Sequence, residues 1–550
     1  MSSKYSKKPA KKEDKSLALQ VSDFILNMSA AWWFIFLLVI YPLFYDNKYF
    51  NIGQVKYEFF KYTSYVFMAT TFIGFLFWIA AHYTDESFNK IIRRFSKTDW
   101  FVAAYWLLTF FSFCACSGAG FGTVPFWGFT GWYMGFLSQS VFVIIYFAIS
   151  RSFKWNPLLF GLALISGGIV YFLAIAQRFG IDILNMYEKL APEHIEKFVS
   201  TLGQTTWYSS YAMLILPVGI FWYMKDKRFV PWLLSGLFVI LGAMSICTVN
   251  SDSAYIALVL ELLVFFWYAF DSNESMFSFL EVVLLIMGGF IGVGAVYKLF
   301  PERELVHVAD SAAIGDFVSK SMFSVCLTLA LLALYIILRM IVKRSYNDKT
   351  KRSDFDISKY KIVRVITVIA AVAVLVMVVA IIILNTNHML PASMSAISNV
   401  GFFNFNDQWG NYRGFNWRVA WKAFTSGSIK DTFIGVGPDC FVFAMEKYCK
   451  TEVDVFWRGI KLVCAHNEWL NTLVTGGILG LISYLGIFIS LFARLAKNAS
   501  KEPASIMIMA AIIAYIGHNF FCYQQCLCTP IIFLLMGVGE MMIRVQKDAN

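Results

Sequence analysis

The chain has 550 residues, of which 59% are apolar and only 15% are charged, and its mean hydropathy is +0.62. A soluble domain of this length does not need so much apolar surface, so these values exclude an ordinary soluble globular protein. The net charge of +11 does not indicate a nucleic-acid-binding protein, because lysines and arginines that flank membrane spans account for it.

The first residues, MSSKYSKKPAKKEDKS, are basic and polar. They contain no apolar region followed by a small-residue cleavage site, so they are not a cleaved signal peptide. We expect residues 1–24 to form a cytoplasmic tail.

Apolar runs of about 20 residues then recur along the whole chain, each long enough to cross a bilayer as a helix. Strands of about ten alternating residues, the signature of a β-barrel, are absent. The sequence therefore predicts an all-α, polytopic transmembrane helix bundle of about 14 spans. They are expected near 25–45, 63–83, 99–117, 133–150, 157–177, 207–224, 229–249, 254–270, 276–299, 321–342, 364–385, 468–492, 505–522 and 529–543.

The distribution of basic residues predicts the orientation. With both termini inside, inner segments carry most of the lysines and arginines, as multi-pass proteins of the inner or plasma membrane do. Residues 25–385 then form eleven spans with short loops, and residues 468–550 form the last spans and a short cytoplasmic tail. Residues 386–467 become one large extracytoplasmic loop between two late spans.

This long loop is the best candidate for a functional region, because long ordered loops are uncommon unless they carry function. Its aromatic residues interleave with Arg413, Arg418, Arg458 and Lys461, among other cations. Two short helices are expected within it. One starts with Asn416 as its cap and runs to about residue 426, and the other covers 438–448.

The loop ends in CAHNEWLNTLVTGGILGLISYL, which places His466 where a wet segment meets an apolar span. Histidine is the side chain best suited to proton transfer near neutral pH. Together with the upstream NWRVAWKAF and FIGVGPDCF, this segment resembles the O-antigen ligase/polymerase family, whose members move glycans from a polyprenyl-pyrophosphate carrier to an acceptor outside the membrane. The specific match covers about residues 416–490.

The resemblance implies a metal-independent glycosyltransferase that needs no cofactor. His466 would act as general base on an acceptor hydroxyl, and Arg418 would bind the pyrophosphate leaving group. The donor would be a polyprenyl-pyrophosphate-linked glycan and the acceptor a glycan, lipid or protein; polymerase and ligase share the motif, with polymerisation mildly preferred. Further substrate contacts are expected from Arg413, Arg458, Lys461, Asn467 and Glu468.

One position departs from the family pattern. In TVNSDSAYIALVL, Asp252 stands where a second arginine is expected, and an acid cannot stabilise a phosphate leaving group. Arg413, Arg458 or Lys461 would have to replace that arginine, or donor recognition would differ. A catalytically inactive relative that binds the carrier is therefore an alternative.

A second alternative is a transporter or flippase of lipid-linked oligosaccharide, which fourteen spans would also suit. It would need no large outer loop carrying His466 and Arg418, whereas an enzyme requires the two to converge at the outer surface. His194, His307, His388 and His518 lack metal-ligand spacing. Among Cys440, Cys449 and Cys464, three disulfide pairings are open.

Overall fold

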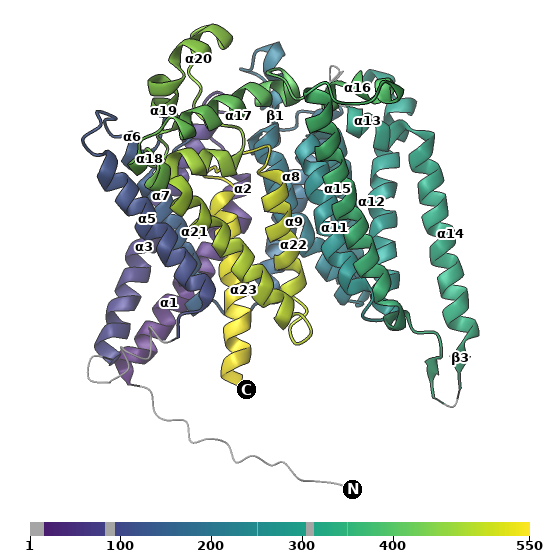
Figure 1. Ribbon diagram of the computed structural model, residues 1–550. Coiled ribbons are helices and arrows are strands. Elements are labelled where there is room, and N and C mark those ends of the chain that lie inside the picture. The colour runs from purple at the N-terminus through teal and green to yellow at the C-terminus, as the bar shows by residue number, and fades with distance from the viewer. Residues whose placement is uncertain (1–15, 83–93, 250, 304–312, 349, 550) are drawn as a thin grey trace.

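The computed structural model describes residues 16–82, 94–249, 251–303, 313–348 and 350–549. Most of the tail predicted for residues 1–24, and His307, lie outside the described residues. Within them the chain is a bundle of long helices, with two two-stranded hairpins as its only strands (Figure 1). The predicted all-α class is confirmed.

A helix lies at each of the fourteen positions that the apolar runs predict, because only a helix satisfies all backbone polar groups within one segment in lipid. Among the described helices, eleven are long and apolar enough to cross a membrane. The other three are α7 and α22, which are shorter, and α9, which contains Pro217. The helices at the fourteen positions are α1 (Leu17–Ile35) continued by the π-helix η1 (Phe36–Ile40) and α2 (Tyr41–Leu43), α3 (Ile52–His82), α5 (Lys97–Cys116), α7 (Phe136–Ser152), α8 (Pro157–Arg178), α9 (Thr205–Lys225), α10 (Phe229–Val249), α11 (Asp252–Ala269), α12 (Asn273–Leu299), α14 (Met322–Arg344), α15 (Ile362–Thr386), α21 (Glu468–Asn498), α22 (Ser505–His518) and α23 (Thr529–Ala549).

The connecting segments form short helices and hairpins. α1 begins and α23 ends at one end of the bundle, and the segment between α15 and α21 covers the opposite end (Figure 1). The connecting elements are α6 (Val124–Trp127), η2 (Pro192–Lys197), β1 (Phe198–Val199), β2 (Gly203–Gln204), η3 (Pro301–Arg303), α13 (Ala313–Lys320), β3 (Tyr346–Asn347), β4 (Arg352–Ser353), η4 (Ile357–Tyr360), η5 (Ala392–Met394), α16 (Ser395–Ser398), η6 (Gly401–Phe403), α17 (Trp409–Thr425), α18 (Ile429–Ile434), α19 (Phe441–Tyr448) and α20 (Lys450–Phe456).

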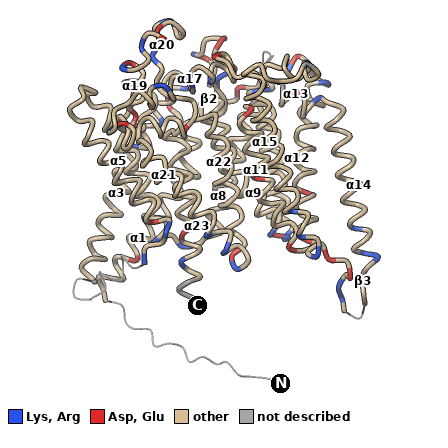
Figure 2. Tube along the Cα trace, viewed as in Figure 1, with Lys and Arg blue, Asp and Glu red and all other residues tan. Residues whose placement is uncertain are grey.

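Charged residues lie mostly near the two ends of the bundle, with few between them (Figure 2). This is the distribution that a bilayer imposes, because an ionised group in hydrocarbon is costly. We call the end at which α1 begins and α23 ends the terminal end, and the opposite end the loop end.

The loop end has a small hydrophobic core of its own. It is built from apolar side chains of α17, α19 and α20, including Phe415, Val419 and Phe441, and it reaches Val474 in α21. The expected helix start at Asn416 is wrong: Asn416 is buried inside α17, where its Oδ1 accepts a hydrogen bond from Trp457 Nε1 at 3.3 Å. The Asn416 side chain therefore binds Trp457 and does not cap a helix.

The loop end is attached to α21 through a break in that helix. Gly477 has a φ of 69°, so the helix kinks there and two carbonyl groups lose their helical partners. Val436 N–H donates to the carbonyl of Val474 and Gly437 N–H to that of Thr475, both at 3.1 Å. A Cβ on Gly435 would lie 2.1 Å from the Thr475 oxygen, so this contact requires glycine.

Candidate functional site

His466 lies two residues before α21, in the left-handed region with a φ of 50°. Its ring meets Trp132 and Tyr523 edge to face, with centroid distances of 6.3 and 5.3 Å. Among the described residues, neither ring nitrogen has a hydrogen-bond partner, and the side chain is only partly buried. A ring held by aromatic contacts alone leaves both nitrogens free for a substrate.

The surroundings keep His466 neutral. Burial, and secondly the positive charge of Arg413, lower the pKa of His466 to about 4. Near pH 7 the imidazole is therefore unprotonated, which is the form that a general base requires.

Arg413 is the arginine that acts on His466. It follows three residues of α17 with positive φ, Gly410 to Tyr412, so the regular helix begins with it. Its Nη1 donates to the carbonyl of Gly410 at 2.7 Å, while Nε and Nη2 donate to the carbonyl of Phe521 at 3.2 and 3.0 Å. Its partners are neutral carbonyl groups, so its charge is not cancelled by a direct ion pair within the described residues.

The pKa of Arg413 is lowered from its usual value, because burial outweighs the opposing effects of Cys522, Tyr523 and Asp252. Asp252, at the start of α11, therefore lies close enough to interact with Arg413 electrostatically. The structure thus brings together His466, Arg413 and the position where the sequence lacks the expected second arginine.

Arg418 occupies a different face of α17. It lies five positions after Arg413, which is about 140° around a helix. Its Nε and Nη2 bind both oxygens of Asp407, at 2.9 and 2.8 Å, and its Nη1 binds Glu452 at 2.7 Å. These two carboxylates raise the pKa of Arg418 and leave the guanidinium occupied on both edges.

The other predicted contacts are scattered. Arg458 is exposed, and Lys461 pairs with Glu446 at 2.7 Å on the surface. Asn467 caps α21, its Oδ1 accepting from the N–H groups of Trp469 and Leu470 at 3.0 Å. Glu468 is buried among hydroxyl and amide groups of α21 and α22, where it accepts hydrogen bonds from Tyr484, Tyr515 and Asn519.

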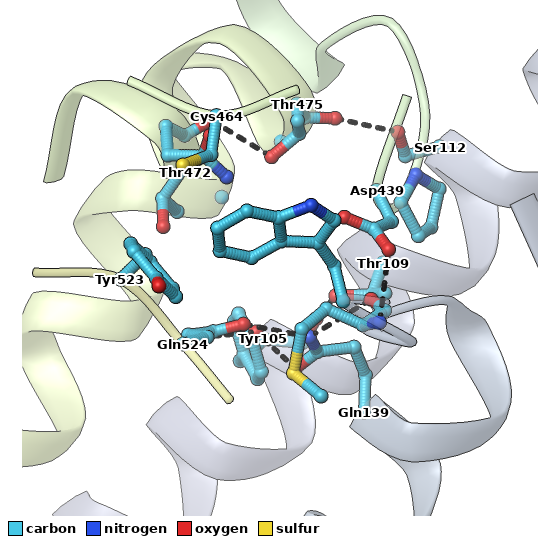
Figure 3. Close-up of a pocket in the computed structure, with 16 residues that line it drawn as sticks. Tyr105, Thr109, Ser112, Gln139, Asp439, Cys464, Thr472, Thr475, Tyr523 and Gln524 are labelled. Carbon is cyan, nitrogen blue, oxygen red and sulfur yellow. Dashed lines mark hydrogen bonds between the residues drawn. The ribbon is translucent and has the colours of Figure 1, made fainter. Parts of the chain in front are cut away.

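The structure also places residues at the site that sequence reasoning did not select. A cavity beside His466 is lined by Trp132, Asp439 and Tyr523, together with uncharged polar groups of α5, α7 and α21 (Figure 3). Asp439 is part of the quoted segment FIGVGPDCF but is not among the site residues that the sequence predicts. Trp132 lies 334 residues before His466 in the chain, and no spacing in the sequence connects them.

In the described part of the chain, no group of three His, Cys, Asp or Glu side chains is placed to hold a metal ion. All ten cysteines are free thiols, so none of the three open pairings is formed in this structure.

Residues 311–485 match the family model described as O-antigen ligase. The matched region contains His466, Arg413, Arg418 and Asp439. A search of curated proteins found no match. The family match confirms the resemblance and supports an O-antigen ligase family assignment, in agreement with the eleven described helices that are long and apolar enough to cross a membrane.

Proposed function

We propose that this chain transfers a glycan from a polyprenyl-pyrophosphate carrier to an acceptor hydroxyl, with His466 as general base. The observation that carries the proposal is the neutral, unbonded imidazole of His466 beside the charge of Arg413, inside the region that matches the family. A glycosyl transfer of this kind needs one group that accepts a proton and one that stabilises the negative charge developing on the leaving group. His466 would supply the first and Arg413 the second.

The proposed step balances without a resident cofactor or metal. The acceptor O–H gives its proton to a ring nitrogen of His466 while its oxygen attacks the anomeric carbon. The bond from that carbon to the pyrophosphate oxygen breaks, and its electron pair leaves with the carrier pyrophosphate. Attack opposite the leaving group inverts the anomeric centre.

For the leaving group, the geometry favours Arg413 over Arg418. A phosphate reaching Arg418 would have to displace a carboxylate from one edge of the guanidinium. A phosphate reaching Arg413 would compete only with neutral carbonyl groups. Arg413 would thereby also replace the arginine missing at Asp252, and Arg418 is kept as the alternative that paired variants can test.

The proposed orientation places both termini in the cytoplasm and the loop end on the outer face of the inner or plasma membrane. Lysines and arginines near the terminal end support it. The carrier would then approach within the bilayer, and its pyrophosphate would reach the loop end, where Arg413 and His466 lie.

The test compares surface glycan and lipid-linked glycan in native cells. The strains express wild type, His466→Ala, and His388→Ala as the control, at matched protein levels. His388 is an exposed histidine of the same outer segment. General-base loss typically costs about 10²- to 10⁴-fold in rate, so His466→Ala should remove long surface glycan and accumulate lipid-linked donor, while His388→Ala behaves as wild type.

The size of the accumulated donor separates the two reactions of the family. Single repeat units on the carrier indicate a polymerase, and a finished but untransferred glycan indicates a ligase. If deletion of the gene changes the profile and His466→Ala does not, the transfer chemistry is refuted at this residue and the flippase alternative takes its place.

A further inference from the structure

The cavity beside His466 has a largely polar lining, although it borders α5 and α21, two helices long and apolar enough to cross a membrane. It lies where α5, α7, the start of α21 and the segments around Asp439 and Tyr523 meet (Figure 3). Most of its polar side chains are uncharged hydroxyl and amide groups, among them Thr109, Gln139, Thr472 and Gln524. The free volume is about 50 Å³, which accommodates a few groups of the size of a water molecule.

Asp439 supplies the carboxylate of this cavity. Its Oδ2 accepts hydrogen bonds from the N–H groups of Phe129 and Met134 at 2.7 and 2.9 Å, which fixes the turn that carries Trp132. Its other oxygen, Oδ1, has no hydrogen-bond partner among the described residues, and the side chain stays partly exposed at the cavity. The cavity therefore contains an acceptor that lacks a donor.

Trp132 connects the cavity to the proposed base. The indole lines the cavity and also meets the rings of His466, at 6.3 Å, and Tyr523, at 4.2 Å. Tyr523 is held in turn by hydrogen bonds with Trp207 and Gln204, at 3.1 and 2.9 Å. The Trp132 ring therefore lies between His466 and a molecule in the cavity. Tyr523, which packs against Trp132, is held in place by its two hydrogen bonds.

We propose that this cavity is a subsite for one sugar ring of the acceptor glycan, with Asp439 accepting hydrogen bonds from its hydroxyl groups and Trp132 covering its apolar face. The inference rests on the proposed function and names a specificity site for it. The hydroxyl-bearing edge of the ring enters the cavity, and the ring itself lies across Trp132.

The lining argues against the other two parts of the substrates. A pyrophosphate carries negative charge, so Asp439 would repel it, and the cavity contains no lysine or arginine. A polyprenyl chain has no hydrogen bonds to offer, so it would leave the hydroxyl and amide groups unsatisfied. A neutral polyol both donates to the carboxylate and exchanges hydrogen bonds with the amides.

Asp439→Asn isolates the cavity-facing oxygen. Asp439 has a φ of 55°, a conformation in which asparagine is as well tolerated as aspartate. The amide oxygen of asparagine can keep both backbone hydrogen bonds, while its NH₂ group replaces the oxygen that faces the cavity. Asp454→Asn is the matched control, because Asp454 is exposed in α20 and pairs with Lys450 instead of bordering the cavity.

The probe is one repeat unit of the native surface glycan, released by mild acid and free of lipid and phosphate, titrated into the purified full-length protein by saturation-transfer NMR. A hydrogen bond to a charged group is worth about 10- to 100-fold in affinity. Asp439→Asn should weaken binding by that factor at an unchanged melting temperature, and Asp454→Asn should bind as wild type.

Thr472→Val provides a second, shape-conserving variant in case Asp439→Asn alters folding. The Thr472 hydroxyl lines the cavity without a hydrogen-bond partner among the described residues. Its loss should weaken binding about threefold to tenfold.

Equal affinity of wild type, Asp439→Asn and Thr472→Val overturns the subsite, and so does failure of the phosphate-free unit to bind wild type at all. Either result leaves the proposed function standing if His466→Ala blocks transfer in cells. An unchanged glycan profile in the His466→Ala strain would instead refute the function itself.

Discussion

The two ends of the bundle differ in how their charged side chains are paired. At the terminal end, the buried carboxylates of Asp99 and Glu540 are surrounded by three arginines: Arg151 and Arg544 bind Asp99, and Arg494 and Arg544 bind Glu540. At the loop end, within the described part of the chain, Arg413 bonds only to carbonyl groups and His466 only contacts aromatic rings.

Under the proposed function, this difference separates a structural role from a chemical one. A cluster in which every charge has a partner fixes the helices that carry it, here α5, α7, α21 and α23. A charge with only neutral partners retains the capacity to bind a charged substrate. Substitutions at the two ends should therefore affect different measurements.

Asp99→Asn should produce the largest loss of stability. The change leaves Arg151 and Arg544 without one carboxylate and weakens the hydrogen bond that Tyr146 donates to Asp99 at 3.0 Å. Breaking a buried ion pair costs about 3 to 5 kcal/mol. Unfolding in mixed micelles should show this loss, while transfer per folded molecule stays near wild type.

Asp226→Asn is the control for that measurement. Asp226 pairs with Arg228, whose side chain is 80% exposed, so its removal should change stability by less than about 1 kcal/mol. A loss of transfer in folded Asp99→Asn protein would mean that the terminal end contributes to the chemistry, and the contrast between the ends would fail.

Arg413→Ala and Arg418→Ala should separate in rate. Removing a preorganised group that stabilises developing negative charge costs about 10²- to 10³-fold, and we expect that loss for Arg413→Ala. Arg418→Ala should cost less than about tenfold, because Asp407 and Glu452 already neutralise that side chain. Steady-state transfer by the two purified variants decides between them, and the reverse order would assign the leaving group to Arg418.

Binding of the acceptor unit should depend on pH through Asp439. Burial raises the pKa of Asp439 to about 6, although its two backbone hydrogen bonds oppose the shift. Below that pH the carboxyl group is protonated, so affinity should fall by up to about tenfold per pH unit in wild type. Burial raises the pKa values of Cys464 and Tyr523, which also line the cavity, so both stay protonated throughout.

Asp439→Asn should have no such pH dependence between pH 5 and 7. The same saturation-transfer titration, repeated at several pH values, provides the comparison. If the affinity of Asp439→Asn also falls as the pH decreases, another group is responsible for the titration and Asp439 does not bind the acceptor.

A further expected effect concerns stability at low pH. The pKa of His466 is lowered in the folded protein, so the unfolded chain binds this proton at a higher pH than the folded chain does. Stability therefore decreases as the pH falls from about 6.5 towards 4. His466→Asn, which tolerates the left-handed φ, should lose less stability than wild type over this range, as measured by unfolding at each pH.

Much of the fold could be predicted from the sequence because bilayer thickness imposes a length on every apolar run. The ends of the helices could not. α3 begins at Ile52, eleven residues before the predicted start, because its first turns mix polar residues such as Gln54 and Lys56 with apolar ones. Hydropathy does not distinguish such a start from a loop.

The site was predictable only where its residues are neighbours in the chain. His466 follows from a local motif, and Arg413 was one of several loop cations that composition could not rank. Trp132 and Asp439 meet because Asp439 accepts hydrogen bonds from the N–H groups of Phe129 and Met134, on either side of Trp132, and that contact depends on tertiary packing. The spacing of these two residues in the sequence does not reveal that contact.

Under the proposed function, the attachment of Val436 and Gly437 to the broken turn of α21 constrains how the glycan reaches the site. Because those hydrogen bonds complete a membrane helix, the segment that carries Asp439 is part of the wall and cannot swing away like a hinged cover. In the proposed reaction, a long glycan must therefore reach the site without displacing this segment. Covalently linking Val436 to α21 should leave turnover intact, whereas lengthening the chain between Gly435 and Asp439 should abolish it.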